Sequence, residues 1–245
     1  MRSAILSDLH SNLEALTRCC EHAAGQNVAR YICLGDCIGY GADPRATLEL
    51  LMGLPGLIAV RGNHDEALFR DMSREAMPAV NRAIAWTRQQ LTLGQLQFLS
   101  ALPYLYQEAG ATYVHASAHG PELWEYVFMP EQAEACMQAA GTPLTFIGHV
   151  HEPRVFYTTA EGRVRELVPP SGVSIPLSPR SRYVINVGSV GQPRDGNNAA
   201  CYLIHDPDAG ELTFHRLPYD YLSAGRKIRA ARLDPDFAAR LAAGR

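Results

Sequence analysis

The stretch FIGHVHEP, residues 146–153, holds two histidines one residue apart, His149 and His151. Alternate residues of an extended chain point to the same side, so both imidazoles could reach one point. Imidazole is a common metal ligand, and two converging imidazoles predict part of a metal site. The alternative is a solvated loop, because such pairs are also common outside metal sites.

Other residues of metal-binding type follow further apolar runs of the chain. They are Asp8 and His10 after SAIL, Asp36 at the end of YICLGD, Asn63, His64 and Asp65 after LIAVRG, and His115 in ATYVHAS. Ligands of open α/β sheets bind beyond the carboxyl ends of the strands, so five strands would deliver these side chains to one edge. A set of this size, with one carboxylate able to bridge, suits two metal ions roughly 3.5–4 Å apart.

Each of these residues also has a structural explanation. Asp8 could cap a helical turn, and Asp36 could be a turn residue between glycines. Asn63 could serve a tight turn with positive φ, and His115 could be a hydrogen-bonded core histidine. All four explanations would have to hold together, whereas the residues fall at strand ends in one order. The joint pattern therefore favours a metal site.

The elements that position these residues alternate between strands and helices. We expect strands at 3–8, 29–36, 56–63, 111–117 and 143–148, and helices at 11–24, 43–53, 78–91, 94–102 and 130–140. The first three strands and two helices have the βαβ rhythm of a sheet with parallel strands. Ser11 and Glu14 predict a capping box for the first helix, and Asp43 and Pro44 predict the start of the second.

After residue 150 the pattern changes to short strands separated by turns. These strands are expected at 154–160, 162–168, 182–188, 199–206 and 211–217. They predict a second, largely antiparallel sheet, with residues 168–181 as a loop and helices within 219–245. No linker separates the two halves, so we expect two packed sheets in a single domain over residues 1–245.

Composition limits the class of protein. The chain has 245 residues, 47% hydrophobic and 19% charged, with a net charge of −3, which is typical of a folded domain. No window approaches the roughly 18 apolar residues of a membrane span, and the N-terminal apolar run is too short for a signal peptide. The six cysteines form neither a paired CxxC zinc pattern nor a secreted disulfide scaffold. We therefore expect a cytoplasmic protein that does not bind membranes.

The ordered set of motifs resembles the calcineurin-like metallophosphoesterase superfamily. The motifs are Asp8-x-His10, Gly35-Asp36, Gly62-Asn63-His64-Asp65, His115 and Gly148-His149-x-His151. NVGSVGQPRDGN (186–197) and GDCIGYGADP (35–44) further resemble its compact bacterial and archaeal phosphodiesterase-like branch. The resemblance implies an α/β (α+β) fold, in which two mixed β-sheets pack as a sandwich flanked by helices in four αββα layers.

The resemblance also implies roles for the motif residues. One metal ion would be held by Asp8, His10, Asp36 and His151, and the other by Asp36, Asn63, His115 and His149, with Asp36 bridging. Manganese is the expected ion, with iron, zinc, cobalt and nickel as alternatives. A hydroxide bridging the metals would attack phosphorus, and His64 would protonate the leaving oxygen as general acid. Asp65 would either orient His64 or cap the following helix.

Several neighbouring residues refine the expected substrate. Arg194 could contact the phosphate or pair with Asp195, and Arg61 could also contact the phosphate. Cys37 is expected to lie beside the ligands without binding metal. Tyr40 stands where protein Ser/Thr phosphatases and symmetrical dinucleoside tetraphosphate hydrolases carry the arginine of GD-x-V-x-R-G. Both activities are therefore disfavoured, and a phosphodiester or small phosphomonoester is favoured.

Substrate specificity is expected to come from the loops at 66–80, 116–130 and 168–181. In the second loop, Trp124, Tyr126 and Phe128 could stack on a nucleobase, or serve packing or an oligomer contact. The expected partner is a small, nucleotide-like phosphate ester, and the oligomeric state is left open.

Two other functional classes compete with a phosphoesterase. A nuclease acting on DNA ends is disfavoured, because the acidic balance and the lack of a basic stripe predict no stable nucleic-acid binding. A non-catalytic protein-binding scaffold of the same fold is the alternative. It is disfavoured because the metal-binding motifs and His64 are all retained.

Overall fold

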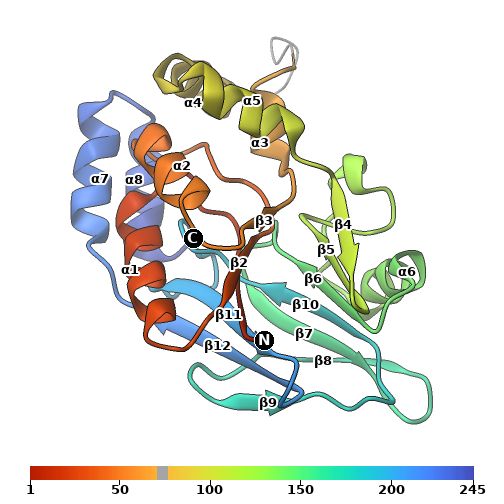
Figure 1. Cartoon of the computed structure of the whole chain (residues 1–245). Coiled ribbons are helices and arrows are strands. Elements are labelled where there is room, and N and C mark those ends of the chain that lie inside the picture. The colour runs from red at the N-terminus through yellow and green to blue at the C-terminus, as the bar shows by residue number, and fades with distance from the viewer. Residues whose placement is uncertain (71–76) are drawn as a thin grey trace.

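Two six-stranded β-sheets pack face to face in the computed structural model, which describes residues 1–70 and 77–245 (Figure 1). The first sheet has the order β3 (Ile58–Ala59), β2 (Arg30–Cys33), β1 (Ser3–Leu6), β11 (Ala200–Asp206), β12 (Glu211–Leu217) and β9 (Ser174–Pro176). The second has the order β4 (Leu105–Glu108), β5 (Ala111–Val114), β6 (Leu144–Ile147), β10 (Tyr183–Val187), β7 (Pro153–Thr158) and β8 (Val164–Leu167). Both sheets contain parallel and antiparallel pairs.

Helices cover the outer faces of both sheets. They are α1 (Leu13–Ala24), α2 (Pro44–Met52), α3 (Asn63–Ala67), α4 (Pro78–Gln90), α5 (Leu93–Ala101), α6 (Pro130–Ala140), α7 (Tyr221–Ala230) and α8 (Pro235–Ala243). Figure 1 shows α1, α2, α7 and α8 on the side of the first sheet and α6 beside the second. The expected four-layer fold is therefore confirmed, whereas a single domain over 1–245 stays a prediction. Within the described ranges, no helix has the length and apolar character needed to cross a membrane.

Alternating apolar side chains explain the layers. In β1, Ile5 lies between the two sheets, while Ala4 and Leu6 belong to the cluster under α1 and α2. In β6, Phe146 lies between the sheets and Ile147 packs in the cluster with α6. Strands apolar on both faces must be covered on both, which is why each sheet carries helices on its outer side.

The strands after residue 150 do not form a sheet of their own. Strands β7, β8 and β10 join the second sheet, whereas β11 pairs with the N-terminal strand β1 in the first. The predicted loop 168–181 contains β9, which pairs with β12, and the short strand β4 was not predicted. Alternating hydrophobicity predicts a strand but not its partner, so this assignment of sheets was wrong.

The first helix is capped by a different residue from the one predicted. Asn12 is the N-cap, and its side chain accepts a hydrogen bond from the Ala15 backbone N–H at 3.2 Å. Ser11 lies one residue earlier with a φ of 53°, and Glu14 pairs with Lys227 at 2.7 Å. The predicted Ser11–Glu14 capping box is therefore wrong. The second helix does start at Pro44 after Asp43, as expected.

Candidate metal centre

The predicted ligand residues meet at one end of the sandwich, and they come from both sheets. Strands β1, β2 and β3 of the first sheet lead to Asp8 and His10, to Asp36, and to Asn63. Strands β5 and β6 of the second sheet lead to His115, and to His149 and His151. The prediction of one edge of one sheet is thus corrected to the matching ends of two packed sheets. All of these residues are buried except Asn63, which is half-buried.

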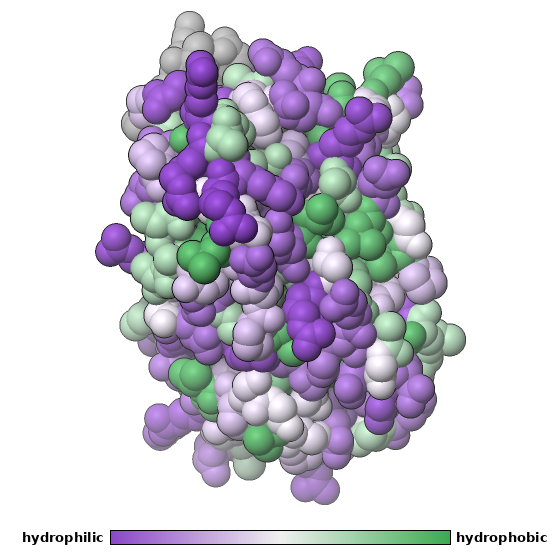
Figure 2. Space-filling view, turned by 90° about the vertical axis from the view of Figure 1, so that its left-hand side faces the viewer, coloured by the Kyte–Doolittle hydropathy of each residue, from purple (hydrophilic) through white to green (hydrophobic). Residues whose placement is uncertain are grey.

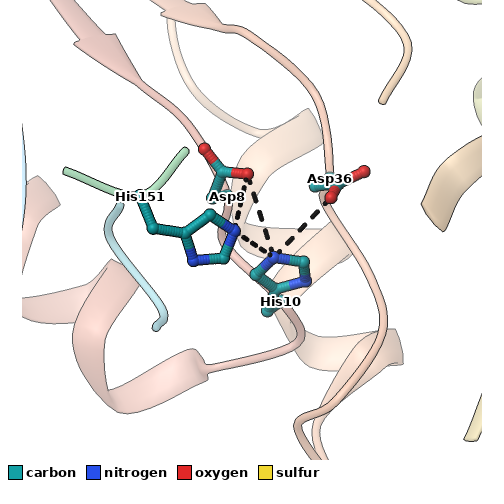
Figure 3. A group of neighbouring side chains, drawn as sticks. All are labelled: Asp8, His10, Asp36 and His151. Atoms are coloured by element: carbon teal, nitrogen blue, oxygen red, sulfur yellow. Dashed lines mark hydrogen bonds and ion pairs between the residues drawn. The ribbon is translucent and has the colours of Figure 1, made fainter. Parts of the chain in front are cut away.

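Asp8, His10, Asp36 and His151 form one compact group of ligand atoms, with their side chains pointing toward one another (Figure 3). Asp8 Oδ1 lies 3.1 Å from His151 Nε2 and 3.8 Å from His10 Nε2. The two Nε2 atoms of His10 and His151 are 3.2 Å apart. Atoms this close could all coordinate one cation.

A second group is formed by Asp36, His115 and His149, with Asn63 beside it. His115 Nε2 lies 3.1 Å from His149 Nδ1 and 3.1 Å from Asn63 Oδ1. Asp36 belongs to both groups, because its Oδ2 lies 3.6 Å from His10 Nε2 and 3.5 Å from His115 Nε2. One carboxylate oxygen therefore stands between the two groups.

The hydrogen bonds of three imidazoles leave their Nε2 lone pairs free to bind a cation. His10, His115 and His151 each direct Nδ1 at a backbone carbonyl, of Ile38 at 3.1 Å, Leu34 at 2.8 Å and Gln192 at 2.5 Å respectively. In a neutral ring Nδ1 then carries the proton, and Nε2 presents a lone pair. The lone pairs of His10 and His151 face each other and the Asp8 carboxylate, whose Oδ1 has no hydrogen-bond donor among the described residues. A divalent cation would satisfy these facing acceptors.

The carboxylates and imidazoles shift one another's protonation. Burial acts against ionised Asp8 and Asp36, but the surrounding histidines outweigh it and hold both pKa values below their usual range. Burial also opposes the charging of His115, yet Asp36 and Asp8 beside it raise its pKa to about 9. Burial and the neighbouring His115 lower the pKa of His149 to about 3. Without metal, a proton on His115 thus offsets part of the carboxylate charge.

The backbone at the site is left-handed rather than extended. Asp8, His10, Asp36, His149 and His151 have φ values of 54°, 47°, 50°, 65° and 66°. Non-glycine residues rarely adopt this region, and such strain clusters at functional sites. The argument that His149 and His151 share one side of an extended chain is therefore wrong. They instead face different groups, as the resemblance implied.

Gly148 explains how the chain reaches this arrangement. A Cβ atom at Gly148 would overlap the Ser7 hydroxyl and the Asp8 carboxylate. The glycine therefore lets the second sheet approach the end of β1, and the His149 backbone N–H donates to Asp8 Oδ2 at 3.0 Å. This contact fixes one Asp8 oxygen and leaves the other facing the histidines.

His64 lies next to both groups without joining either. Its Nε2 is 4.0 Å from Asp36 Oδ2, and its Nδ1 has no hydrogen-bond partner within the described residues. Burial lowers the pKa of His64. Asp65 does not orient this ring, because its carboxylate accepts from the backbone N–H groups of Gly62 and Cys37 at 3.0 Å each. The capping alternative for Asp65 is the one observed.

A cavity of about 370 Å³ opens onto the two groups, and its lining tests the predicted specificity loops. The loop 116–130 contributes Trp124 and Tyr126, and the Tyr126 ring stacks on His149 at 4.2 Å between ring centroids. Phe128 stacks on Tyr126 instead, outside the lining. The loop 66–80 contributes Glu66, although residues 71–76 lie outside the described residues. No residue of 168–181 lines the cavity, so that prediction was wrong.

Of the two arginines expected near the phosphate, only Arg194 lies at the cavity. Arg194 lines the cavity, and its guanidinium lies 5.9 Å from the centre of the Tyr40 ring. Its alternative partner Asp195 pairs with Arg216 instead. Arg61 lies over Tyr104 at 5.1 Å and donates to the Ser100 carbonyl, so it does not reach the cavity.

Some residues of the site carried no signal in the sequence. Glu66 lines the cavity and accepts hydrogen bonds from Tyr104 and Trp124, and Arg240 reaches the cavity from α8. Helical periodicity places Arg240 on a helix but says nothing of what that helix packs against. Cys37 has its Sγ 3.7 Å from Cys33 and belongs to neither ligand group, as expected.

Known proteins resemble this chain over nearly its whole length. Residues 1–210 match the model of the calcineurin-like phosphoesterase superfamily domain. The uncharacterized protein MJ0912 of Methanocaldococcus jannaschii is 36% identical over 250 residues, which span 99% of this chain and 98% of that protein. The crystal structure of a metallophosphoesterase from Sphaerobacter thermophilus is 39% identical, with a TM-score of 0.89 over 100% of this chain and 99% of that one. The hypothetical protein PH1004 of Pyrococcus horikoshii OT3 shares the fold, with a TM-score of 0.81 at 18% identity over 98% and 97% of the two chains.

Proposed function

This chain belongs to the calcineurin-like phosphoesterase superfamily, and from this membership we propose that it is a dinuclear metal-dependent phosphoesterase. The observation that carries the proposal is the position of Asp36 Oδ2, which lies within 3.6 Å of a histidine nitrogen in each of the two ligand groups. A carboxylate shared in this way suits a pair of divalent cations better than one.

In the proposed centre each group of residues holds one cation. Asp8, His10, Asp36 and His151 hold the first, and Asp36, Asn63, His115 and His149 hold the second. Divalent cations held there would supply an activated water and positive charge for the phosphoryl oxygens. The mixed imidazole, carboxylate and amide donors suit manganese, and they are also compatible with iron, zinc, cobalt or nickel.

The remaining residues position the ester and move its protons. Arg194 reaches the cavity with a buried Nε that has no partner in the described part of the chain, so it can bind a phosphoryl oxygen. The attacking water gives one proton to solvent as its oxygen forms the new bond to phosphorus, and the bond from phosphorus to the leaving oxygen breaks. His64, beside Asp36, donates the proton that the leaving oxygen needs.

We propose a phosphodiester as the preferred substrate, with a small phosphomonoester as the alternative. Tyr40 takes the place of the arginine in the phosphatase motif, and Tyr126 offers an aromatic face beside His149 for a nucleotide-like substituent. The competing scaffold function is disfavoured, because it would leave the facing lone pairs of buried His10 and His151 without a cation to bind.

The test compares hydrolysis of bis-p-nitrophenyl phosphate and p-nitrophenyl phosphate. Metal-stripped protein is refilled with manganese, and bound metal is counted by mass spectrometry. His64→Gln should lower kcat by about 10²–10⁴-fold with the metal content unchanged. His119→Gln, which changes an exposed histidine, is the matched control and should keep full activity.

The outcomes separate the candidate functions. Faster turnover of the diester supports a phosphodiesterase, and faster turnover of the monoester supports a phosphatase. Absence of both bound metal and turnover would overturn the enzyme proposal and favour the scaffold.

A further inference from the structure

One wall of the cavity is cationic and comes from the C-terminal part of the chain. Arg194 follows β10, and Arg240 lies on α8. A third arginine in the lining, Arg70, is paired with Glu66 at 2.6 Å. Arg194 pairs with no carboxylate of the described residues; it donates to Gln192 Oε1 at 3.0 Å and lies over the Tyr40 ring. This wall thus has a positive charge that the protein itself leaves unbalanced.

Arg240 also has guanidinium N–H groups that are available to bind an anion. It forms an ion pair with Asp236 one turn earlier on α8, through Nε at 2.8 Å. Its two terminal nitrogens donate to no group among the described residues, and they are the part of a guanidinium that best matches an oxyanion. Figure 2 shows the side of the molecule that carries α7 and α8, where strongly hydrophilic residues gather in the upper part.

Tyr40 connects this wall to the reacting centre. Its ring lies 4.6 Å from the ring of His64, and on another side Phe237 of α8 packs edge-on at 5.0 Å. The guanidinium of Arg194 lies 5.9 Å from the centre of the same ring, and Arg240, on the helix that carries Phe237, lines the same cavity. A group that extends from His64 across Tyr40 therefore reaches both guanidinium groups.

In the proposed function, His64 marks the side on which the leaving group departs. The other side of the centre is aromatic, with Tyr126 on His149 and Trp124 edge-on to His115. Arg194 and Arg240 thus lie on the leaving-group side, whereas Arg70 is paired with Glu66 on the side of Trp124. We propose that the leaving group of the substrate carries a second oxyanion, a carboxylate or a further phosphate, which Arg240 binds together with Arg194. This inference rests on the proposed phosphoesterase function.

The experiment compares two diesters that differ by one carboxylate on the leaving group. They are methyl 4-nitrophenyl phosphate and methyl 3-carboxy-4-nitrophenyl phosphate, assayed with manganese-loaded protein at low salt. The carboxylated diester should have a kcat/KM about tenfold higher in the wild type, since one charge-assisted contact is worth about that factor. Arg240→Gln should bring this ratio down toward one. Arg229→Gln, on the exposed face of α7, is the matched control and should keep the wild-type ratio.

A binding measurement separates failure of this inference from failure of the proposed function. Calorimetry with the protein as purified should show 3-carboxy-4-nitrophenol binding more tightly than 4-nitrophenol, and Arg240→Gln should remove the difference. That result without turnover of either diester would support the anion site and refute the phosphodiesterase. Turnover with equal kcat/KM for the two diesters, or an unchanged ratio in Arg240→Gln, would overturn the anion site alone.

Discussion

On metal binding, the histidine ligands should release close to one proton per chain at pH 8, and that proton should come from His115. Carboxylates beside this histidine outweigh its burial and raise its pKa to about 9, whereas burial lowers the pKa of both His10 and His149. A histidine must lose its proton before Nε2 can bind a cation. His115 is the member of this set that still carries a proton at pH 8.

The size of the effect follows from the pKa. A group with a pKa of about 9 is roughly 90% protonated at pH 8, so binding should release about 0.9 proton. Histidines at the ordinary value of about 6.5 would together release only about 0.1 proton at this pH. The cost of deprotonation at pH 8 is about 1.4 kcal/mol, so the affinity should rise nearly tenfold between pH 7 and pH 8.

Isothermal titration calorimetry measures this proton directly. Manganese is titrated into metal-free protein at pH 8 in two buffers of different ionisation enthalpy, and the difference in heat gives the protons released. His119→Gln should release the same number, because this exposed histidine lies outside both ligand groups. Heats that do not depend on the buffer would refute the assigned charge of His115.

Three further predictions concern the support of the site and the fold. Gly39→Ala should lower the kcat for diester hydrolysis at least about tenfold with unchanged metal content, because Gly39 has a φ of +97° and a Cβ there would overlap His64 Nδ1. Wild-type activity in this variant would contradict the placement of His64. His205, whose pKa burial lowers to about 4, takes up its proton more readily in the unfolded chain, so the free energy of unfolding should fall by about 2–3 kcal/mol as pH drops from 7 to 4.5. Urea denaturation should show a smaller fall in His205→Gln, and equal falls would refute the assignment. Asn12→Ala removes the cap of α1 and a hydrogen bond to the Gly191 carbonyl, and should cost about 1–3 kcal/mol in urea denaturation; a loss below about 0.5 kcal/mol would contradict that role.

The grouping of the site residues could be predicted because it depends on local features. Asp8, Asp36 and His115 each follow or end a short apolar run, and parallel strands place such positions at a common end. Side-chain type then limits the chemistry to cation binding. The local backbone could not be predicted in the same way, because left-handed φ values at His149 and His151 arise from the closure of the site rather than from their own preference.

The sequence alone could not predict which distant segments of the chain pair with each other. Residues 199–206 read as a strand, but nothing in their pattern indicates that β11 pairs with β1. For the same reason the periodicity of α8 did not place Arg240 in the cavity. A strand or helix pattern shows that one face of the element is buried, but it does not show which other element covers that face.

The pairing of the first strand with a late one has a consequence for synthesis on the ribosome. The antiparallel neighbour of β1 is β11, and the carbonyl that orients His151 belongs to Gln192. A nascent chain therefore carries Asp8 and His10 long before the groups that complete their site exist. The complete site forms only after β11 has emerged, which ends at residue 206 of 245, so a cation bound by the whole set stabilises a nearly complete fold rather than an early one.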